Sequence, residues 1–369
     1  MSVAINGTNG ITYNDGSLQP SAPVGRNLII NGDMAIDQRN VGASITPTDT
    51  QYSVDRWTCR LSASGKYTAQ QNAAAVTPPA GFTNYLGATS TSAYSVGSSD
   101  YFMLRQMIEG SNITDLNWGT SNAQTITLSF WARSSLTGTF GGSVQNSASN
   151  RSYPFTYTIG SANTWEYKTI TIPGDTSGTW LTTNGIGIKL NFNLGNGSSF
   201  SGSAGAWAAA NYHSASGVVS VVGTSGATLY ITGVQLEANT TATPFENLQY
   251  GQQLALCQRY LQSSWSQGSA IGSAVSLTTN STQQSWGSNN AGIAGQAFLL
   301  PVTMRTSPTL VVYDMALNVG KVTTLGNGAG QTNNVSANNS ATTTNMFYVR
   351  LYGNNQAGMV FAYTLTAEL

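Results

Sequence analysis

Residues that could carry out acid–base or nucleophilic chemistry are scarce in this sequence of 369 residues. His213 is the only histidine, so a Ser-His-Asp or Cys-His site would have to include it. Its neighbours, Tyr212 and Ser214, lie in a stretch rich in Ala, Gly and Ser that contains no nucleophile elbow. We therefore expect His213 to be a surface or inter-subunit residue, and we expect the protein not to be an enzyme.

The two cysteines, Cys59 and Cys257, lie far apart and in no C-x-x-C or metal-ligand spacing. Together with the single histidine, this spacing disfavours a zinc site, and the sequence predicts neither a metal nor a cofactor. A disulfide between the two is an open alternative. We expect two buried free thiols, because free cysteine packs as a small hydrophobic residue.

Hydrolysis of a glycan would need two carboxylates at a defined separation. The acidic residues of the first two thirds of the chain are instead scattered. The main ones are Asp100, Glu109, Asp115, Glu166 and Asp175. Their spacing does not show whether two of them converge, so a glycosidase stays an alternative. No Gly-rich string has the strand-to-helix context of a nucleotide site.

Sugar binding requires less, since an exposed aromatic ring can stack on the apolar C–H face of a sugar while polar groups bind its hydroxyls. Trp131 is the leading candidate, because the alternation of residues places it on the polar face of its strand. The alternative for Trp131 is packing against a neighbouring subunit. Trp57 is predicted to be a core residue. Further candidates for sugar contact are Arg133, Trp180, Lys189, Asn191, Trp207 and Tyr212.

Charged residues make up only 8% of the chain, where about 25% is typical, and the formal net charge is +0. A surface of Ser, Thr, Asn, Gln and Gly offers little charge for salt to screen and no electrostatic attraction to nucleic acid or anionic lipid. No stretch approaches the roughly 18 apolar residues of a membrane span, and residues 1–12 do not resemble a signal peptide. Such a surface suits a protein that works outside a cell after release by another route, such as lysis.

The chain reads as a succession of short strands after an irregular start. Residues 1–26, rich in Gly, Asn, Ser and Pro, predict an arm with room for one small hairpin. In 125–132 and 185–194, apolar and polar residues alternate, which is typical of strands with one face in a core. In 229–236 the alternation slips by one residue near Gly233, which predicts a β-bulge.

One short helix is predicted, because Tyr250, Leu254, Cys257 and Leu261 recur at helical spacing. A second β region follows, in which the polar segment 320–344 is either a long loop or a hairpin with extended arms. Its predicted strands are 298–304, 309–314, 346–352 and 359–366. Many short strands with few helices predict an all-β protein of two β-sandwiches joined by the helix at 250–262.

Four segments resemble strands of carbohydrate-binding-module-like jelly rolls. Segment 27–34 (NLIINGDM) resembles the opening strand of such folds, and 127–133 (TLSFWAR) resembles a central strand. Segment 164–172 (TWEYKTITI) resembles the next strand, and 229–237 (LYITGVQLE) the closing one. The four occur in the family's order at plausible spacing.

A second set of segments resembles bacteriophage tail-fibre and related virion proteins. It comprises 7–12 (GTNGIT) with 14–17 (NDGS), 55–57 (DRW), 242–246 (ATPFE), 254–260 (LALCQRY) and 300–309 (LPVTMRTSPT). The resemblance implies a jelly roll at 27–249, a linking helix at 250–262, a smaller β-sandwich domain at 263–369 and a homotrimer. It also implies an exterior tail fibre, attached to other tail or baseplate proteins by the arm at 1–26, that binds host surface glycan during adsorption.

Two other roles remain open. The same folds serve as spacers, so the protein could be a purely structural virion component of the baseplate, collar or head decoration. A glycan depolymerase is the other role. Family members that hold a structural calcium use acidic residues near the first and last strands. Here Asp33 is present, but Thr232 and Gly233 stand where an acidic pair is common, so we expect Asp33 to bond within a turn instead.

Trimerisation is directly testable, and burial of surface in an oligomer would also counter the aggregation risk of so little charge. Light scattering at micromolar concentration should give three times the chain mass of 38.7 kDa. A monomer would contradict the trimer.

Overall fold

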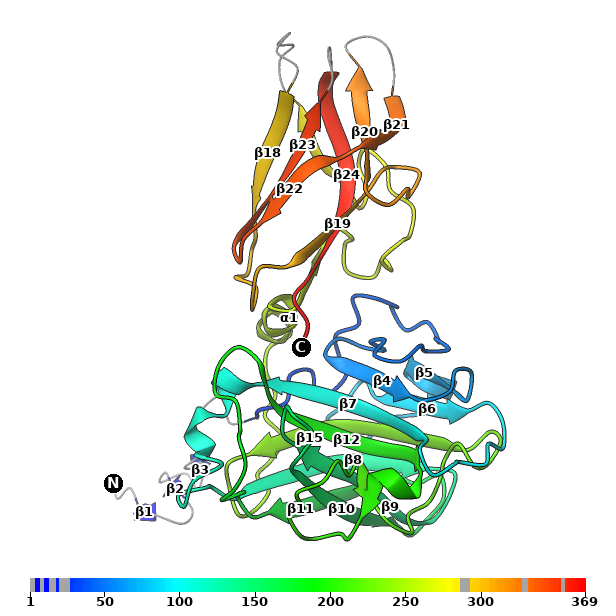
Figure 1. Ribbon diagram of the computed structural model, residues 1–369, viewed down its shortest axis with the longest axis vertical. Helices are drawn as coiled ribbons and strands as arrows, with labels where there is room; N and C mark the ends of the chain where they lie inside the picture. Colours follow the sequence, from blue (N-terminus) through cyan, green and yellow to red (C-terminus); the bar gives the residue numbers. More distant parts are fainter. Residues whose placement is uncertain are drawn as a thin grey trace.

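The computed structural model describes residues 4–6, 10–12, 18–19, 27–285, 293–326, 331–352 and 356–369. Within these ranges the chain is built from strands, one α-helix and four 3-10 helices. Figure 1 shows a larger β-sandwich and a smaller one, with the helix α1 between them. The prediction of an all-β protein with a jelly roll, a short linking helix and a second, smaller sandwich is confirmed.

The larger sandwich consists of two five-stranded antiparallel sheets. Sheet I has the order β10-β9-β12-β7-β4, and sheet II has the order β11-β8-β15-β6-β5. The strands of sheet I are β4 (Trp57–Leu61), β7 (Tyr101–Glu109), β9 (Gly138–Gln145), β10 (Ser152–Ile159) and β12 (Ile186–Asn196). Those of sheet II are β5 (Tyr67–Gln71), β6 (Leu86–Ser90), β8 (Ile126–Ser134), β11 (Glu166–Ile172) and β15 (Thr228–Glu237).

Short elements connect these strands. They are η1 (Ala73–Ala75), η2 (Gly110–Asn112), η3 (Thr114–Leu116), η4 (Ser198–Phe200), β13 (Ser201–Gly202) and β14 (Ser214–Ala215). The described pieces of the N-terminal arm form β1 (Ala4–Asn6), β2 (Gly10–Thr12) and β3 (Leu18–Gln19). The middle strand β2 pairs antiparallel with both β1 and β3. Most of the arm predicted at 1–26 lies outside the described residues.

Alternate residues of β8 and β12 fill the core between the two sheets, as predicted. Phe130 of β8 and Phe192 of β12 meet edge to face with ring centroids 4.9 Å apart. Trp57 is also fully buried, and its indole N–H donates to the Asn31 carbonyl at 3.0 Å. Because each strand turns only every second side chain inward, the remaining residues of both sheets point outward.

The predicted bulge in β15 is present. The register between β15 and β8 shifts between Thr232 and Gln235, and Gly233 has a φ of 59°. The extra residue lets Ile231 and Val234 both point into the core although they lie three positions apart.

The linking helix α1 spans Tyr250–Gln258, and the predicted apolar stripe along it is only partly right. Cys257 is buried, but Tyr250 is 53% exposed. Leu261 lies beyond the helix and begins β16 (Leu261–Ser263), because its backbone pairs with the C-terminal strand. Cys59 and Cys257 are both buried free thiols, as expected.

The smaller sandwich is centred on β24 (Gln356–Thr366), whose residues Met359, Phe361, Tyr363 and Leu365 contribute to its core, as the alternation predicted. The described residues of the segment 320–344 adopt the hairpin alternative, with β20 (Lys321–Gly326) paired to β21 (Gln331–Ser336). One sheet has the order β16-β24-β20-β21, with β17 and β19 also paired to β24, and the other has the order β18-β23-β22. The remaining bounds are β17 (Thr282–Ser285), β18 (Ile293–Leu299), β19 (Thr309–Tyr313), β22 (Asn338–Thr342) and β23 (Met346–Tyr352).

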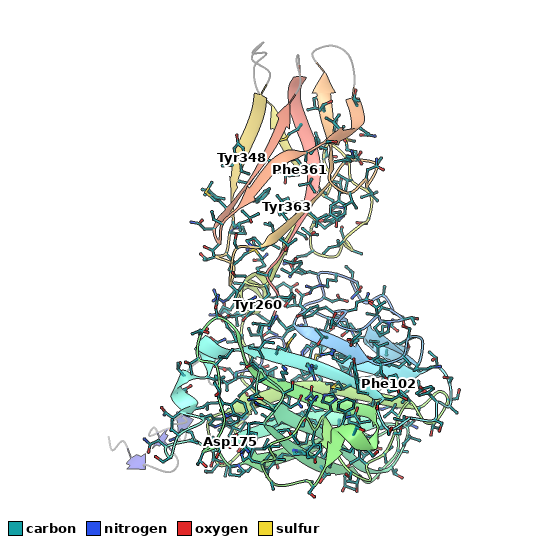
Figure 2. All side chains as sticks on the ribbon, viewed as in Figure 1. Phe102, Asp175, Tyr260, Tyr348, Phe361 and Tyr363 are labelled. Atoms are coloured by element: carbon teal, nitrogen blue, oxygen red, sulfur yellow. The ribbon has the colours of Figure 1, made fainter. Side chains whose placement is uncertain are left out.

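A buried ion network joins the two sandwiches beside α1, where Figure 1 places the C-terminus. Glu368 accepts hydrogen bonds from Arg39, at 2.7 Å, and from Arg56, which also donates to the Met107 carbonyl. The Arg56 guanidinium lies 3.5 Å from the centre of the Tyr260 ring, which Figure 2 shows at this junction. Through these contacts the C-terminal segment is bonded to the first sandwich.

A second ion pair reinforces the junction. Arg259 forms a bidentate pair with Glu109 at 3.0 and 2.7 Å, and the Tyr260 hydroxyl donates to the same carboxylate at 2.8 Å. Two of the segments that resemble virion proteins, 55–57 and 254–260, thus meet here.

In the described part of the chain no helix is both long enough and apolar enough to cross a membrane.

The charge of Glu368 should matter to stability. Burial raises the pKa of this carboxyl, but the charges of Arg56 and Arg39 outweigh burial and hold the pKa below its usual 4.5. The stabilisation is therefore fully present above about pH 4.5 and is lost as the pH falls through the lower folded-state pKa. Glu368→Gln should lower the free energy of unfolding by about 3 kcal/mol at pH 7, because it leaves Arg56 buried and unpaired.

Urea denaturation of the full chain at pH 7 and at about pH 3.5 measures this effect, and the gap between variant and wild type should narrow at the lower pH. The control is Glu166→Gln, which breaks the more exposed pair with Lys168 and should cost less than about 1 kcal/mol. An equal loss at both pH values would show that charge is not what Glu368 contributes.

Candidate functional site

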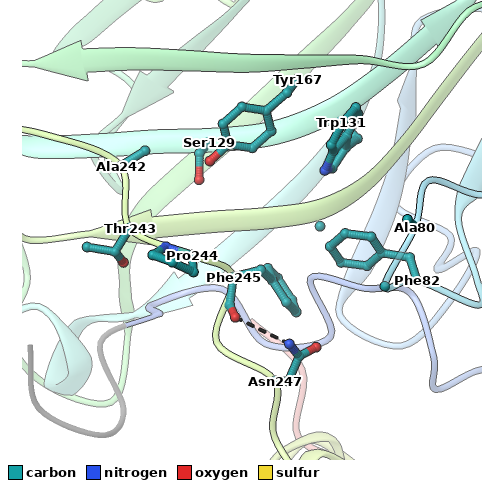
Figure 3. Close-up of a pocket in the computed structure, with 12 residues that line it drawn as sticks. Ala80, Phe82, Ser129, Trp131, Tyr167, Ala242, Thr243, Pro244, Phe245 and Asn247 are labelled. Atoms are coloured by element: carbon teal, nitrogen blue, oxygen red, sulfur yellow. Dashed lines mark hydrogen bonds between the residues drawn. The ribbon is translucent and has the colours of Figure 1, made fainter. Parts of the chain in front are cut away.

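The outer face of sheet II carries a pocket of about 640 Å³ lined by aromatic rings. Figure 3 shows Trp131 and Tyr167 on one side of this aromatic pocket and Phe82 and Phe245 on the other. The full lining is Ala80, Gly81, Phe82, Ser129, Trp131, Tyr167, Gly233, Ala242, Thr243, Pro244, Phe245 and Asn247. The site thus combines a sheet surface with two loops, at 80–82 and 242–247.

The sheet supplies two rings in fixed register. Trp131 of β8 lies directly opposite Tyr167 of β11, with their ring centroids 5.4 Å apart and their planes at 50°. Both point away from the core, because Phe130 and Ala132 occupy the inward positions on either side of Trp131. Trp131 is half-buried and Tyr167 is 45% exposed, so both rings are accessible.

The loops supply the other two rings. Phe82 and Phe245 meet edge to face with centroids 5.1 Å apart. Phe82 reaches this position because Gly233 has no side chain, since a Cβ there would lie 2.5 Å from the Phe82 ring. The bulge in β15 therefore has a second effect, which is to let Phe82 lie against the strand.

Polar groups of the pocket are neutral. Ser129, Thr243 and Asn247 line it, and no lining residue carries a charged side chain. The Thr243 backbone N–H and hydroxyl both donate to the Glu237 carboxylate, at 2.9 and 2.7 Å, which fixes the loop that bears Phe245. The Asn247 amide lies at the rim, where it donates to the Phe245 carbonyl at 3.4 Å.

Of the residues predicted to contact sugar, only Trp131 lines this pocket. Arg133 lies two positions along β8 on the same face, where its guanidinium donates to the Asn163 carbonyl at 3.0 Å and lies 5.5 Å from the Tyr230 ring centre. It is a neighbour of the pocket and not part of its lining.

The structure places Trp180 and Trp207 in a separate aromatic cluster with Trp118. The three rings meet edge to face with centroids 4.5 to 5.4 Å apart. Their indole N–H groups are bonded internally, that of Trp180 to the Ser177 carbonyl at 3.2 Å and that of Trp207 to the Pro173 carbonyl at 2.8 Å. Trp180 and Trp207 are therefore engaged in packing within the chain, away from the aromatic pocket.

Lys189 and Asn191 lie on the outer face of sheet I, but that face is covered by the chain's own segment 197–222. Asn191 is fully buried and Lys189 is 8% exposed, so neither is free at a surface. Tyr212 belongs to the covering segment and packs against Gly202. The alternation placed the two side chains on the correct face but could not show that a later segment covers it.

His213 belongs to this segment and is buried, which corrects the expectation of a surface or inter-subunit position. Phe200 stacks on its ring with centroids 4.6 Å apart and planes at 3°, and Tyr101 meets it edge to face.

Sequence reasoning did not single out Tyr167, Phe82 or Phe245. For Tyr167 a signal existed, because 166–172 alternates and its partner strand carries Trp131. Phe245 belongs to the segment 242–246 that resembles virion proteins. For Phe82 no local pattern was available, since a loop residue is placed by tertiary contacts.

Most of the carboxylates considered for catalysis have structural partners. Asp175 pairs with Arg151 at 2.5 Å, Glu166 with Lys168 at 2.6 Å, and Glu109 with Arg259. Asp100 accepts hydrogen bonds from the Ser62 and Tyr94 hydroxyls. Asp115 lies in the 3-10 helix η3 and is exposed.

Asp33, considered for calcium, accepts the Ala35 backbone N–H at 3.4 Å and the Gln253 side-chain amide. The described residues include no group of three or more His, Cys, Asp or Glu side chains placed to hold a metal ion.

The chain matches no protein-family model and no curated protein. Among solved structures, it is similar to the enzymatically active domain of tailspike protein 4 of bacteriophage CBA120, with 13% identity and a TM-score of 0.32. That similarity covers 58% of this chain and 22% of the tailspike chain, so the match spans about a fifth of that protein.

Two further similar structures are carbohydrate-binding modules. A family 4 module is 15% identical, with 56% of this chain and 100% of the module covered and a TM-score of 0.29. A tandem of two family 22 modules from Paenibacillus barcinonensis is 10% identical, with 95% and 93% covered and a TM-score of 0.28. TM-scores this low do not establish a shared function, so the function of this chain has to be inferred from its aromatic pocket and its sequence.

The contact between Gly233 and Phe82 can be tested by substitution. Gly233→Ala adds a methyl group at a positive φ and displaces Phe82, so we expect it to cost more than the roughly 1 kcal/mol of backbone strain alone. Gly226→Ala is the matched control, since Gly226 has a φ of 74° and open space around its missing Cβ. Urea denaturation compares the two. Equal costs would mean that Phe82 is not held against Gly233.

Proposed function

We propose that this protein binds glycan, and that the aromatic pocket takes a neutral sugar. The observation that carries the proposal is the set of four aromatic rings, two of them accessible on a rigid sheet, around a pocket with no charged lining residue. Aromatic faces attract the C–H faces of a pyranose ring, and the neutral Ser129 hydroxyl and Asn247 amide match sugar hydroxyls. The volume of about 640 Å³ lies within the usual range for small-ligand pockets.

Rigid placement favours this use of the pocket. The backbone of Trp131 and Tyr167 is held by a continuous antiparallel register from Glu166 to Ile172, so little backbone freedom remains to be lost on binding. The loop that bears Phe245 is fixed by its bonds to Glu237. A preformed platform of this kind binds with a smaller entropic cost than a mobile one.

We further propose that the protein acts on the exterior of a phage particle as a trimeric tail fibre during adsorption to the host. The sequence resemblance to tail-fibre proteins and the charge-poor surface support this role. A trimer would present three pockets, and simultaneous engagement raises the avidity for a surface glycan above the affinity of one pocket.

The side chains that line the aromatic pocket favour binding over catalysis. The pocket lining contains no carboxylate, and the acidic residues at 109, 166 and 175 are engaged in ion pairs elsewhere. A purely structural virion protein would expose aromatic rings of this kind only where a neighbouring subunit packs on them.

Two substitutions test the pocket. Trp131→Ala and Tyr167→Ala should each weaken binding of a neutral oligosaccharide about tenfold or more, since one stacking surface is removed. The matched control is Tyr250→Ala, which removes a ring of similar exposure, 53% against 45%, outside the pocket. Calorimetric titration of glycan-array hits measures the affinities.

The proposed role in host adsorption is tested with the same variants, by measuring how much labelled protein binds to susceptible cells. Loss of sugar binding and adsorption in the two pocket variants, with the control unchanged, is the expected result. Unchanged adsorption in a folded Trp131→Ala trimer would show that Trp131 is not the sugar platform. No adsorption of the wild-type protein to any susceptible host would contradict the receptor role, and absence of any array hit would favour the structural alternative.

A further inference from the structure

The segment 72–85, here called the strap, supplies part of the wall of the aromatic pocket. It connects β5 to β6 at one edge of sheet II, and Ala80, Gly81 and Phe82 of the strap line the pocket. Much of the strap is open to solvent. Its exposed residues are Ala74, Ala75, Thr77, Ala80, Gly81 and Thr83. The position of the strap therefore depends on a small number of contacts, and whatever holds the strap also holds Phe82.

The strap begins with strained backbone. Ala74 and Ala75 have φ values of 57° and 49°, in the left-handed region. This region is unfavourable for a residue with a Cβ, and alanine has no polar side chain that could offset the cost by a local hydrogen bond. A strained conformation of this kind persists only where the surrounding contacts hold it in place.

Trp165 makes the contact that fastens the far end of the strap. Its indole N–H donates to the Thr77 carbonyl at 2.9 Å. Among the described residues, this is the one hydrogen bond that ties 77–83 to the chain outside the strap. The Trp165 ring also meets the Tyr85 ring edge to face at 5.4 Å, and the Tyr85 hydroxyl accepts the Val76 backbone N–H at 2.7 Å.

The fastened strap reaches across the outer face of sheet II. Trp165 directly precedes β11, which lies at the opposite edge of the sheet from β5. Under the strap, the Tyr85 ring packs on Tyr230 of β15 with centroids 5.3 Å apart. The same strand β11 therefore presents Tyr167 to the pocket and, through the residue before it, secures the segment that carries Phe82.

The chain between Thr77 and Phe82 is stiff, so the position of one sets the position of the other. Pro78 and Pro79 each fix their own φ. The Phe82 backbone N–H then donates to the Pro79 carbonyl at 3.1 Å, which closes a tight turn. From this turn the Phe82 ring packs against Gly233.

We propose that Trp165 is a positioning residue of the aromatic pocket, because its hydrogen bond to Thr77 keeps the strained strap closed with Phe82 across the pocket from Trp131 (Figure 3). The inference rests on the proposed sugar site and assigns Trp165 an effect on binding without contact, since Trp165 does not line the pocket. When the bond is lost, open conformations of the strap become populated, and the apparent affinity falls with the fraction that stays closed.

Trp165→Phe keeps an aromatic ring and removes the indole N–H. It should weaken binding of the neutral oligosaccharide about fivefold, the equivalent of one hydrogen bond, as measured by calorimetric titration. The matched control is Trp207→Phe, which removes an indole N–H that donates to the Pro173 carbonyl at 2.8 Å outside the pocket. The control should bind as the wild type does. An affinity of Trp165→Phe equal to that of the wild type would overturn the proposal.

A double-mutant cycle separates positioning from a general loss of stability. If Trp165 acts through Phe82, Trp165→Phe should add little to the loss of affinity caused by Phe82→Ala. Losses that multiply would show independent action and contradict the proposal. Ala74→Gly provides a rescue, because glycine adopts a positive φ readily, and it should restore part of the affinity of Trp165→Phe. Failure to restore any affinity would mean that the bond does not oppose backbone strain.

Hydrogen exchange of the ligand-free protein tests the strap without any sugar. The backbone amides of Val76 and Phe82 should exchange about fivefold faster in Trp165→Phe, while those of β12 stay unchanged, because local opening of the strap becomes easier. Unchanged exchange at Val76 and Phe82 would overturn the role of Trp165 even if the wild type binds sugar. Faster exchange in a protein whose wild type binds no sugar would confirm the fastening and refute the sugar site instead.

Discussion

A sheet can bury only alternate side chains in the core of a sandwich, and this constraint organises the larger domain. The apolar residues of β8 and β12 face each other, with Phe130 against Phe192, and their neighbours must point outward. On sheet II the outward residues include Trp131, and on sheet I they include Arg105 and Asn191. The aromatic pocket therefore depends on core packing that fixes the register of the strands beneath it.

The two outer faces are used differently because different segments cover them. Sheet II is only bordered by the loops at 80–82 and 242–247, which leaves an open aromatic pocket. Sheet I lies beneath segment 197–222, which packs the His213 ring against Tyr101 of β7. The same polar alternation thus yields an accessible aromatic pocket on one side and a covered polar face on the other.

The junction shows how a charge-poor chain uses its few ions. Glu368 and Glu109 bind Arg39, Arg56 and Arg259, and these contacts bond the smaller domain to the larger one. Burial together with the nearby charge of Glu368 raises the pKa of Asp55 to about 6, in spite of Arg39. Of the described charged side chains, Asp55, Arg56 and Glu109 are buried at this junction.

The sequence alone determined the all-β class, the inward faces of 125–132 and 185–194, the bulge at Gly233 and the outward position of Trp131, because pleat and glycine conformation are local properties. It did not determine the end of the helix at Gln258, since pairing with β24 draws Leu261 into a strand. Only tertiary structure placed Phe82 and Phe245 around Trp131 and covered Asn191 and His213, because contacts between distant segments leave no periodic signal in the chain.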